Sequence, residues 1–358
     1  MRQELFIQSA VALSPQLSFD RKDFLKPAVY QQSGKLFAID IEYRNYISPV
    51  AIRRMSRIMK MTISTAMEAL KAAGVSSPDA IITGTGRGGV TDMEHFVKDM
   101  IRMDEGPMNP TQFIQSTYNS PNGWIAMQSN STGYNQTYVH RGSSFELALL
   151  DAQMMSAETD LPLNILAGCF DELTEEYYFI RGKRGYWKRP AIPTNELYIH
   201  GNTPGTIAGE GTAFFVLSNQ AGKSVAKIVD LKILYNAREL DVPAMIKNTL
   251  DEAGLKPEDI SLVLMGDNGD CRQGIYYQDL STIFPDEVLG RFKHLSGEYD
   301  TAMGFAVWLA DHIIRTGEVP EACQNNRKSG SDIKHILILN HYILGTASIL
   351  LMSRTFGI

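Results

Sequence analysis

The sequence is poor in cysteine and has no long block of like charge. Its 358 residues include three cysteines, Cys169, Cys271 and Cys323, which are too few and too scattered for a disulfide framework or a zinc site. We therefore expect no metal centre. The 34 basic and 40 acidic residues give a formal net charge of −6, which argues against a general nucleic-acid-binding protein.

Long uninterrupted hydrophobic runs are also missing. The first residues, MRQELFIQSAVALS, include Glu4 and Gln8 and end without a signal-peptide cleavage site, so they are predicted to form a strand. The most apolar segment, HILILNHYILGTASILLM, is interrupted by Asn340, His341 and Gly345, which favours buried strands over a membrane-spanning helix. The sequence therefore predicts a cytoplasmic protein without a membrane partner.

Helical and strand-like patterns alternate along the chain, which is typical of an α/β protein. The window EALKAAGVSSPDAIITGTG, which starts at Glu68, and the window NTLDEAGLKPEDISLVLMGDNG, which starts at Asn248, both run from a helix through a glycine to a buried strand and a glycine loop. This recurrence predicts a duplicated unit, with one half at residues 1–220 and the other at residues 221–358. Chance is the alternative, because helix–glycine–strand units are common in α/β proteins.

The segment TYVHRGSSFELALLDA, residues 137–152, predicts a short strand, a glycine corner and a helix with an apolar stripe. A nucleophile at such a corner would gain from the helix dipole and the free amide groups of the first turn. The corner residue, however, is Gly142, which has no side chain. Ser143 and Ser144 follow it, and serines in a first turn are more typical of helix caps than of nucleophiles.

Five motifs in order give the chain a resemblance to the β-ketoacyl synthases of the thiolase superfamily. They are TGTGRGG, TYNSPNGWIAM with Asn119, LAGCFDELTE, GEGTAFFVLS and the final GTASILLM. The resemblance implies a thiolase-like fold, in which two similar α/β halves form a five-layer α-β-α-β-α sandwich. It also implies that the strand at about residues 136–140 pairs with its counterpart in a second subunit.

The same resemblance implies that the catalytic residues are absent. The cysteine position of the family falls on Gly142, and the two histidine positions fall on Gly266 and Glu298, whereas Lys293 is retained. Without a thiolate there is no covalent acyl intermediate, and without imidazoles the developing enolate loses its hydrogen-bond donors. We therefore expect no catalytic residue and no cofactor, and whether the chain is an enzyme stays open. The residues expected to line the pocket are Asn119, Ser143 and His341, although the preferred interpretation of His341 is a core histidine rather than a catalytic one.

The family includes chain length factors, which are synthase-like subunits that lack the cysteine and pair with an active ketosynthase. The resemblance implies such a role in a type II fatty-acid, polyketide or aryl-polyene-like pathway, with the acyl carrier protein as a second partner. Gly142 departs from the glutamine that chain length factors of aromatic polyketide pathways often carry. Arg53, Arg54 and Arg57 are the candidate carrier-docking residues, and a solvated basic helix face would explain them as well.

Three other interpretations remain at this point. One is an acyl-thioester hydrolase or acyltransferase that uses Ser143 or Ser144, and another is a homodimeric protein that binds acyl chains. The third is a dinucleotide-binding enzyme, because Gly84, Gly86 and Gly89 fit the spacing G-x-G-x-x-G after a predicted strand.

Overall fold

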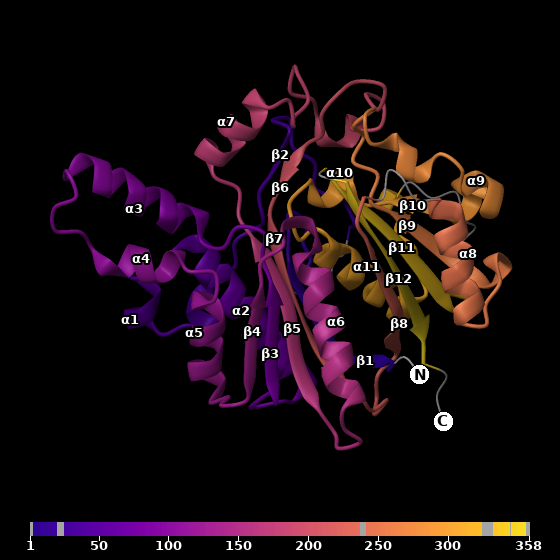
Figure 1. Ribbon diagram of the computed structural model, residues 1–358, viewed down its shortest axis with the longest axis horizontal. Coiled ribbons are helices and arrows are strands. Elements are labelled where there is room, and N and C mark those ends of the chain that lie inside the picture. Colours follow the sequence, from indigo (N-terminus) through magenta and orange to yellow (C-terminus); the bar gives the residue numbers. More distant parts are fainter. Residues whose placement is uncertain (1–2, 20–24, 237–240, 324–331, 344, 356–358) are drawn as a thin grey trace.

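Ten strands form one continuous sheet in the computed structural model, which describes the chain except residues 1–2, 20–24, 237–240, 324–331, 344 and 356–358 (Figure 1). The order across the sheet is β10-β9-β11-β12-β8-β1-β7-β5-β3-β4. The first five strands of this sheet along the chain are β1 (Leu5–Leu13), β3 (Ala80–Gly84), β4 (Tyr134–Tyr138), β5 (Asn164–Asp171) and β7 (Gly211–Ser218). The other five are β8 (Ala226–Leu234), β9 (Ile260–Met265), β10 (Leu289–Arg291), β11 (His335–Tyr342) and β12 (Thr346–Arg354).

The two sets of five strands have the same topology. The order β1-β7-β5-β3-β4 matches β8-β12-β11-β9-β10, and in both sets the first three strands pair antiparallel and the last three pair parallel. Helix α2 (Arg57–Ala73) precedes β3 and helix α8 (Val242–Glu252) precedes β9. The glycines that follow these helices, Gly74 and Gly254, have φ angles of 71° and 69°, a conformation that glycine adopts readily. The predicted boundary at residue 220 lies between β7 and β8, and the halves as separate domains stay a prediction.

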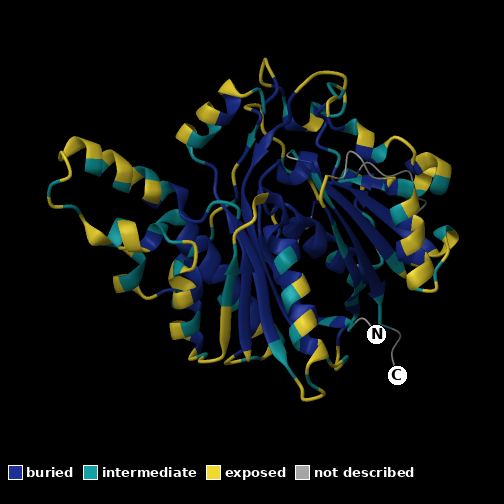
Figure 2. Cartoon of the chain, in the orientation of Figure 1, coloured by how far each residue is buried: buried dark blue, intermediate teal, exposed yellow. Residues whose placement is uncertain are grey.

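Helices cover both faces of each half and so produce five layers. Helix α2 packs on one face of the first half, and α8 packs on the outer face of the second half. Helices α6 (Ser144–Ala157) and α11 (Met303–Thr316) lie between the halves, where their apolar side chains join those of both sets of strands in the largest core cluster. The predicted α/β class and the five-layer arrangement are therefore confirmed. Figure 2 shows that the buried residues concentrate in the strands and the central helices.

The remaining elements lie around this core. They are β2 (Lys35–Leu36), which pairs with β6 (Ala208–Gly209), and the helices α1 (Pro49–Ile52), α3 (Val90–Arg102), α4 (Pro110–Ser116), α5 (Ser120–Ser129), α7 (Glu175–Lys183), α9 (Leu280–Ile283) and α10 (Lys293–Ser296). Helices α3 and α4 pack on each other and project from the body of the molecule (Figure 1). Among the described residues, no helix combines the length and the apolar character that crossing a membrane requires.

Candidate functional site

The corner at Gly142 is filled by a tyrosine from the other half of the chain. Strand β4 ends at Tyr138, a short 3-10 turn covers Arg141–Ser143, and α6 begins at Ser144. A Cβ atom placed on Gly142 would lie 2.2 Å from Cγ and 2.3 Å from Cβ of Tyr342, the last residue of β11. Carbon atoms that are not bonded do not approach so closely, so any larger residue at position 142 requires Tyr342 to move.

Tyr342 is held in this position by a buried polar cluster. Its hydroxyl accepts a hydrogen bond of 3.2 Å from Arg181 Nη2. Nearby, Arg87 Nε forms an ion pair of 2.8 Å with Asp300. Burial, followed by the negative charge of Asp300, raises the pKa of Tyr342 well above its ordinary value, so the phenol stays protonated. The ring is therefore a fixed, neutral filler rather than a nucleophile or base.

The space beside Gly266, where the sequence resemblance predicts the first family histidine, is filled in the same way. A Cβ atom on Gly266 would lie 2.3 Å from Oδ1 of Asn340. Asn340 and Tyr342 are two residues apart in β11, so their side chains leave the strand on the same face. The structure thus places Gly142 and Gly266 against neighbouring side chains of one strand, and in both places a residue from β11 occupies the space that a larger side chain would need.

Glu298, which the sequence resemblance predicts to stand at the second histidine position, forms a buried ion pair with Lys293. Lys293 Nζ lies 3.0 Å from Glu298 Oε1, and the two side chains are only 1% and 2% exposed. Asn268 Nδ2 donates a hydrogen bond of 3.1 Å to Glu298 Oε2. Burial raises the pKa of Glu298, and the charge of Lys293 opposes that rise. Both oxygens of Glu298 are thus bound within the chain.

A further buried carboxyl group, Glu146, lies one helical turn after Gly142 and was missed by the sequence analysis. Glu146 accepts a hydrogen bond of 2.9 Å from Ser348 Oγ. Burial raises its pKa to about 7, although the hydrogen bonds and Lys293 oppose the rise. The signal in the sequence that could have indicated a buried carboxyl group is an acidic residue within a helix that is apolar on most sides. Because Glu146 is buried, its ionisation acts on the stability of the fold rather than on an open site.

The three predicted pocket residues do not come together. Ser143 is buried at the corner, but Asn119 is exposed at the start of α5. His341 is buried, and its Nδ1 lies 2.8 Å from the hydroxyl of Tyr277 while its ring stacks on Tyr276. Side chains alternate along a strand, so His341 leaves β11 on the face opposite to Tyr342. His341 is therefore a core residue of the second half, because it faces away from Gly142.

Ser144, one of the two serines that the hydrolase interpretation could use, closes the helix end. Its Oγ donates a hydrogen bond of 2.7 Å to the carbonyl of Arg141 and accepts one of 2.8 Å from the amide of His140. Both contacts bind the hydroxyl to the turn that precedes α6. Ser144 thus has the geometry of a structural residue, as its position in the first turn predicts.

The glycine-rich loop after β3 packs against protein atoms. A Cβ atom on Gly86 would lie 2.2 Å from Cβ of Asp300, and one on Gly84 would lie 2.4 Å from the backbone of Ser144. Asp171 joins this loop to the second half, because it accepts bonds from the amides of Gly86 and Thr301, each of 3.0 Å. The glycines thus allow close packing between the halves. The space that a dinucleotide phosphate would need at Gly86 is filled by Asp300.

Two of the three predicted docking arginines have exposed side chains that a partner could reach. Arg53 and Arg54 are exposed at the end of α1. Arg57 is bound within the chain: its Nε lies 2.9 Å from Asp40 Oδ1, its Nη2 donates 2.7 Å to the carbonyl of Ala38, and its Nη1 pairs with the buried Glu210. We conclude that Arg57 stabilises the start of α2, and the same guanidinium cannot serve a carrier protein without breaking these bonds.

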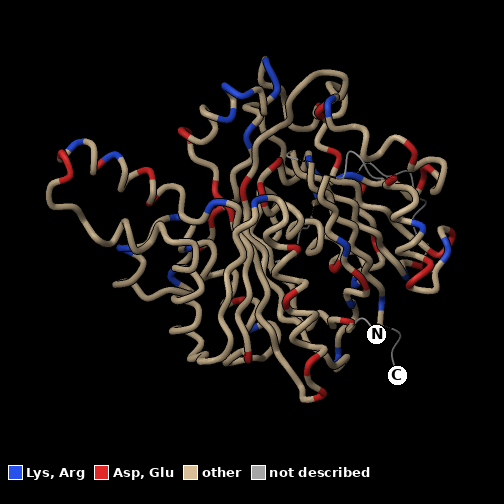
Figure 3. Tube along the Cα trace, in the orientation of Figure 1, with Lys and Arg blue, Asp and Glu red and all other residues tan. Residues whose placement is uncertain are grey.

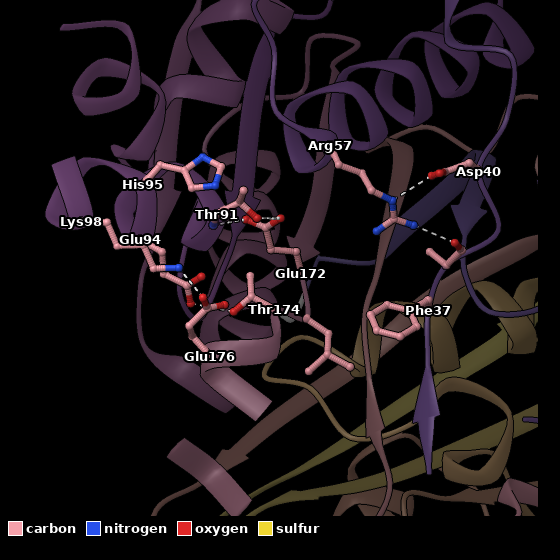
Figure 4. A pocket seen from close by; sticks show the side chains of 12 residues that line it. Phe37, Asp40, Arg57, Thr91, Glu94, His95, Lys98, Glu172, Thr174 and Glu176 are labelled. Carbon is pink, nitrogen blue, oxygen red and sulfur yellow. Dashed lines mark hydrogen bonds and ion pairs between the residues drawn. The ribbon is translucent and has the colours of Figure 1, made fainter. Parts of the chain in front are cut away.

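Arg57 also lines a surface cavity of about 460 Å³ (Figure 4). In this cavity Glu172 accepts bonds of 2.8 Å from the amide and the hydroxyl of Thr91, Thr174 donates to Glu94, and Lys98 pairs with Glu176. Burial raises the pKa of Glu172 to about 7. These polar groups therefore satisfy one another. Within the described residues, no group of three or more His, Cys, Asp or Glu side chains is arranged to hold a metal ion.

Two halves of this topology, with two helices buried between them, define a ketosynthase-like fold of the thiolase type. The chain is similar to the β-ketoacyl synthase from Burkholderia phymatum STM815, with a TM-score of 0.79 and 15% identity over 99% of this chain and 100% of that chain. It is similar to the ishigamide ketosynthase/chain length factor, with a TM-score of 0.80 and 16% identity over 100% of both chains.

A third similar structure is the ketosynthase ApeO in complex with its chain length factor ApeC from Xenorhabdus doucetiae, with a TM-score of 0.74 and 13% identity over 99% of this chain and 98% of that chain. At these identities the likeness establishes the fold, and the predicted resemblance to the β-ketoacyl synthases is confirmed at that level. No protein-family model matches the sequence, and no curated protein matches it significantly.

Proposed function

We propose that this chain is a noncatalytic ketosynthase-like subunit of the chain length factor type, which pairs with an active ketosynthase and helps to shape the acyl tunnel. The observation that carries the proposal is the ring of Tyr342 in the space where a catalytic side chain at position 142 would lie. A site that is filled by a neutral, buried ring can bind no acyl group at this corner and can perform no covalent step there.

The buried thiols of Cys169 and Cys323 and the imidazoles of His294 and His341 do not replace the missing groups. Burial raises the pKa of both Cys169 and Cys323 well above the ordinary value of a thiol, which keeps them protonated and unreactive. His294 Nε2 lies 2.6 Å from the carbonyl of Ala322, and burial lowers its pKa to about 4. His341 points to the opposite face of β11. These placements support a role without condensation chemistry.

An exposed sheet edge supports pairing with another subunit. Strand β4 is the last strand of the sheet and pairs with β3 on one side. Its residues are exposed or half-buried, and Tyr134 and Val139 are large exposed side chains in and next to it. An uncovered strand edge is a ready template for a strand from another chain. The similar ApeO structure is a ketosynthase in complex with its chain length factor.

Helices α3 and α4 add an apolar surface that a partner would cover. Ile101 is 76% exposed, and Phe113 and Ile114 are 56% and 58% exposed. Exposed apolar side chains that gather on a projecting element mark interaction surfaces more often than isolated ones do. We infer that this projecting pair of helices contacts the ketosynthase partner. The complex would act with an acyl carrier protein in the cytoplasm, in a fatty-acid, polyketide or aryl-polyene-like pathway.

Co-purification tests this assignment. The tagged chain is co-expressed with each cysteine-containing ketosynthase of the source organism, and the mass of the complex is measured by light scattering. The proposal predicts a stable one-to-one complex that Val139→Arg, next to the sheet edge, weakens. Glu258→Lys, at an exposed position in the second half of the chain, serves as a surface control. A chain that forms homodimers in the presence of every ketosynthase would instead favour the homodimeric acyl-binding protein.

A further inference from the structure

One long segment of the chain carries almost no charge. Between Glu105 and Glu146 the sequence contains no aspartate or glutamate, and its only lysine or arginine is Arg141. The segment includes α4, α5, β4 and the corner before α6. By contrast, the 13 residues of α3, which precede it, include five charged side chains of both signs (Figure 3). We call residues 106–145 the charge-poor segment.

Much of the charge-poor segment nevertheless lies at the surface. Met127 in α5 is 65% exposed and Tyr134 in β4 is 45% exposed, in addition to Phe113 and Ile114 in α4. Helix α5 contacts both α4 and β4, so the three elements form one continuous face (Figure 1). Charged side chains are depleted, and aromatic side chains enriched, in the cores of protein interfaces. The composition of this face therefore suits burial against another protein.

Arg141 is the single fixed charge of this face, and the backbone holds it in an unfavourable conformation. Its φ angle is 51°, in the left-handed region that residues with a Cβ atom rarely adopt. The carbonyl of Arg141 accepts a hydrogen bond from Ser144 Oγ, a contact that involves the backbone and not the guanidinium. A glycine would adopt this φ angle readily. The local fold therefore gives no reason for an arginine at this position.

The guanidinium of Arg141 has no acidic partner in the part of the chain that the structure describes. Arg141 is exposed, and no described carboxylate forms an ion pair with it. The two residues before it, Val139 and His140, are exposed as well. An outward-facing cation in a strained conformation, next to an uncovered strand edge, indicates a contact outside the chain. A guanidinium that becomes buried in an interface requires a carboxylate, because an unpaired buried charge is costly.

We propose that Arg141 forms an ion pair with a carboxylate of the ketosynthase when β4 pairs with an edge strand of that partner, and that this ion pair favours the ketosynthase over a second copy of the chain. The inference rests on the proposed function, which supplies the partner. The planar guanidinium can bind both oxygens of one carboxylate, which makes such a pair directional as well as strong. Because the rest of the face is uncharged, the charge-poor segment offers a partner no other cation from lysine or arginine.

A second copy of the chain offers Arg141 no carboxylate from the paired strand. Two copies related by a two-fold axis would pair their β4 strands antiparallel. For a register centred on any residue of β4, Arg141 faces a position between residues 127 and 135 of the other copy. That range, MQSNSTGYN, contains no aspartate or glutamate. Self-pairing therefore leaves the guanidinium without a partner on that strand, which acts against the homodimer.

The test compares the affinity of the ketosynthase for the wild-type chain and for charge variants, by biolayer interferometry at several salt concentrations. Arg141→Glu is expected to weaken the complex at least tenfold, because it brings two carboxylates together. Arg141→Gly is expected to weaken it severalfold and to reduce its salt dependence. The matched control is Lys247→Glu, which reverses an exposed cation on α8 in the second half and is expected to change the affinity less than twofold.

Two further measurements separate the contact from the fold and identify the carboxylate. Glycine suits the φ angle of 51°, so Arg141→Gly is expected to be at least as resistant to thermal unfolding as the wild type. Each aspartate and glutamate in and beside the edge strand of the ketosynthase is then replaced by lysine, one at a time. One of these replacements is expected to restore the binding of Arg141→Glu at least tenfold. Analytical ultracentrifugation of the Arg141→Gly chain alone is expected to show self-association no weaker than that of the wild type.

Three outcomes would overturn the inference while the proposed function stands. One is binding of Arg141→Glu and Arg141→Gly to the ketosynthase with the affinity of the wild type. Another is failure of every lysine replacement in the ketosynthase to restore the binding of Arg141→Glu. A third is an equal loss of self-association and of ketosynthase binding in Arg141→Gly, because Arg141 would then not distinguish the two partners. Absence of a ketosynthase complex with the wild-type chain would instead overturn the proposed function.

Discussion

Tyr342 occupies the space that a side chain at position 142 would need. The two residues are separated by 200 positions in the sequence, yet a Cβ atom on Gly142 would lie 2.2 Å from the ring of Tyr342. Glycine at the corner and tyrosine at the end of β11 are thus complementary parts of one packing arrangement. A cysteine introduced at position 142 would therefore overlap with Tyr342 unless that ring moves.

The contact predicts a specific coupling between the two positions. Gly142→Ala is expected to destabilise the protein by about 1–3 kcal/mol, because the added methyl group overpacks the site. In a Tyr342→Ala background the same methyl group finds space, so its cost is expected to fall by about 1 kcal/mol or more. Urea unfolding of the wild type, both single variants and the double variant measures this coupling. Additive effects of the two substitutions would contradict the contact.

The buried pair of Lys293 and Glu298 gives a second prediction. Lys293→Met leaves Glu298 buried without its cation, and Glu298→Gln leaves the Lys293 ammonium without its anion. Each substitution is expected to cost about 3–5 kcal/mol in free energy of unfolding. The double variant should be more stable than the sum of the two losses predicts, since it leaves no unpaired charge. Single variants that unfold like the wild type would show that the pair is not desolvated in solution.

The pH dependence of stability follows from the buried carboxyl groups. Burial raises the pKa of Glu146 to about 7, so between about pH 4.5 and pH 7 the folded chain keeps a proton that the unfolded chain releases. The stability that this proton confers is complete at low pH and is lost as the pH rises through 7. Asp171 and Glu172 act in the same direction, because burial also raises the pKa of each to about 7.

Glu146→Gln removes the contribution of one of these carboxyl groups to the pH dependence of stability. We expect the free energy of unfolding of the wild type to fall between pH 5 and pH 8, and that of the variant to fall less steeply. The two slopes are expected to differ by at most about 1.4 kcal/mol per pH unit. Chemical unfolding at a series of pH values gives both slopes. Glu258→Gln, at an exposed position, is the control and should keep the wild-type slope. Equal slopes for the wild type and Glu146→Gln would rule out the raised pKa.

Arg57 is predicted to act in folding rather than in docking. Arg57→Ala removes the cation next to Glu210, whose side chain is 1% exposed, and should destabilise the chain by about 3–5 kcal/mol. The neighbouring exposed residue gives a matched comparison, because Arg54→Ala should change stability by no more than about 0.5 kcal/mol. Thermal unfolding of both variants measures this difference in stability. A loss of carrier binding by Arg57→Ala with unchanged stability would restore Arg57 to a docking role.

The fold was predictable because its signals are local and repeated. The glycines at positions 74 and 254 end equivalent helices, and the order of motifs gave the thiolase-like architecture before any coordinates. The assignment of the family's catalytic positions to Gly142, Gly266 and Glu298 also comes from local motifs, and it stays a prediction. Each of these signals depends on residues within one segment of the chain.

The contents of the site were not predictable, because they depend on contacts between distant segments. Nothing in the sequence near Gly142 indicates that Tyr342 fills its corner, and nothing near Gly266 indicates Asn340. The assignment of Arg57 to docking had the same weakness, because its partners Asp40 and Glu210 come from other elements. His341 was assigned to the pocket, but strand alternation turns it away from Gly142.

The most direct test of the central claim is a condensation assay with and without the partner. The purified chain, its ketosynthase complex, and a complex in which the ketosynthase cysteine is replaced by alanine are each given acyl and malonyl carrier protein, and products are read by mass spectrometry. We predict extension by the intact complex only. Extension by the purified chain alone, or by the complex without the ketosynthase cysteine, would contradict the account.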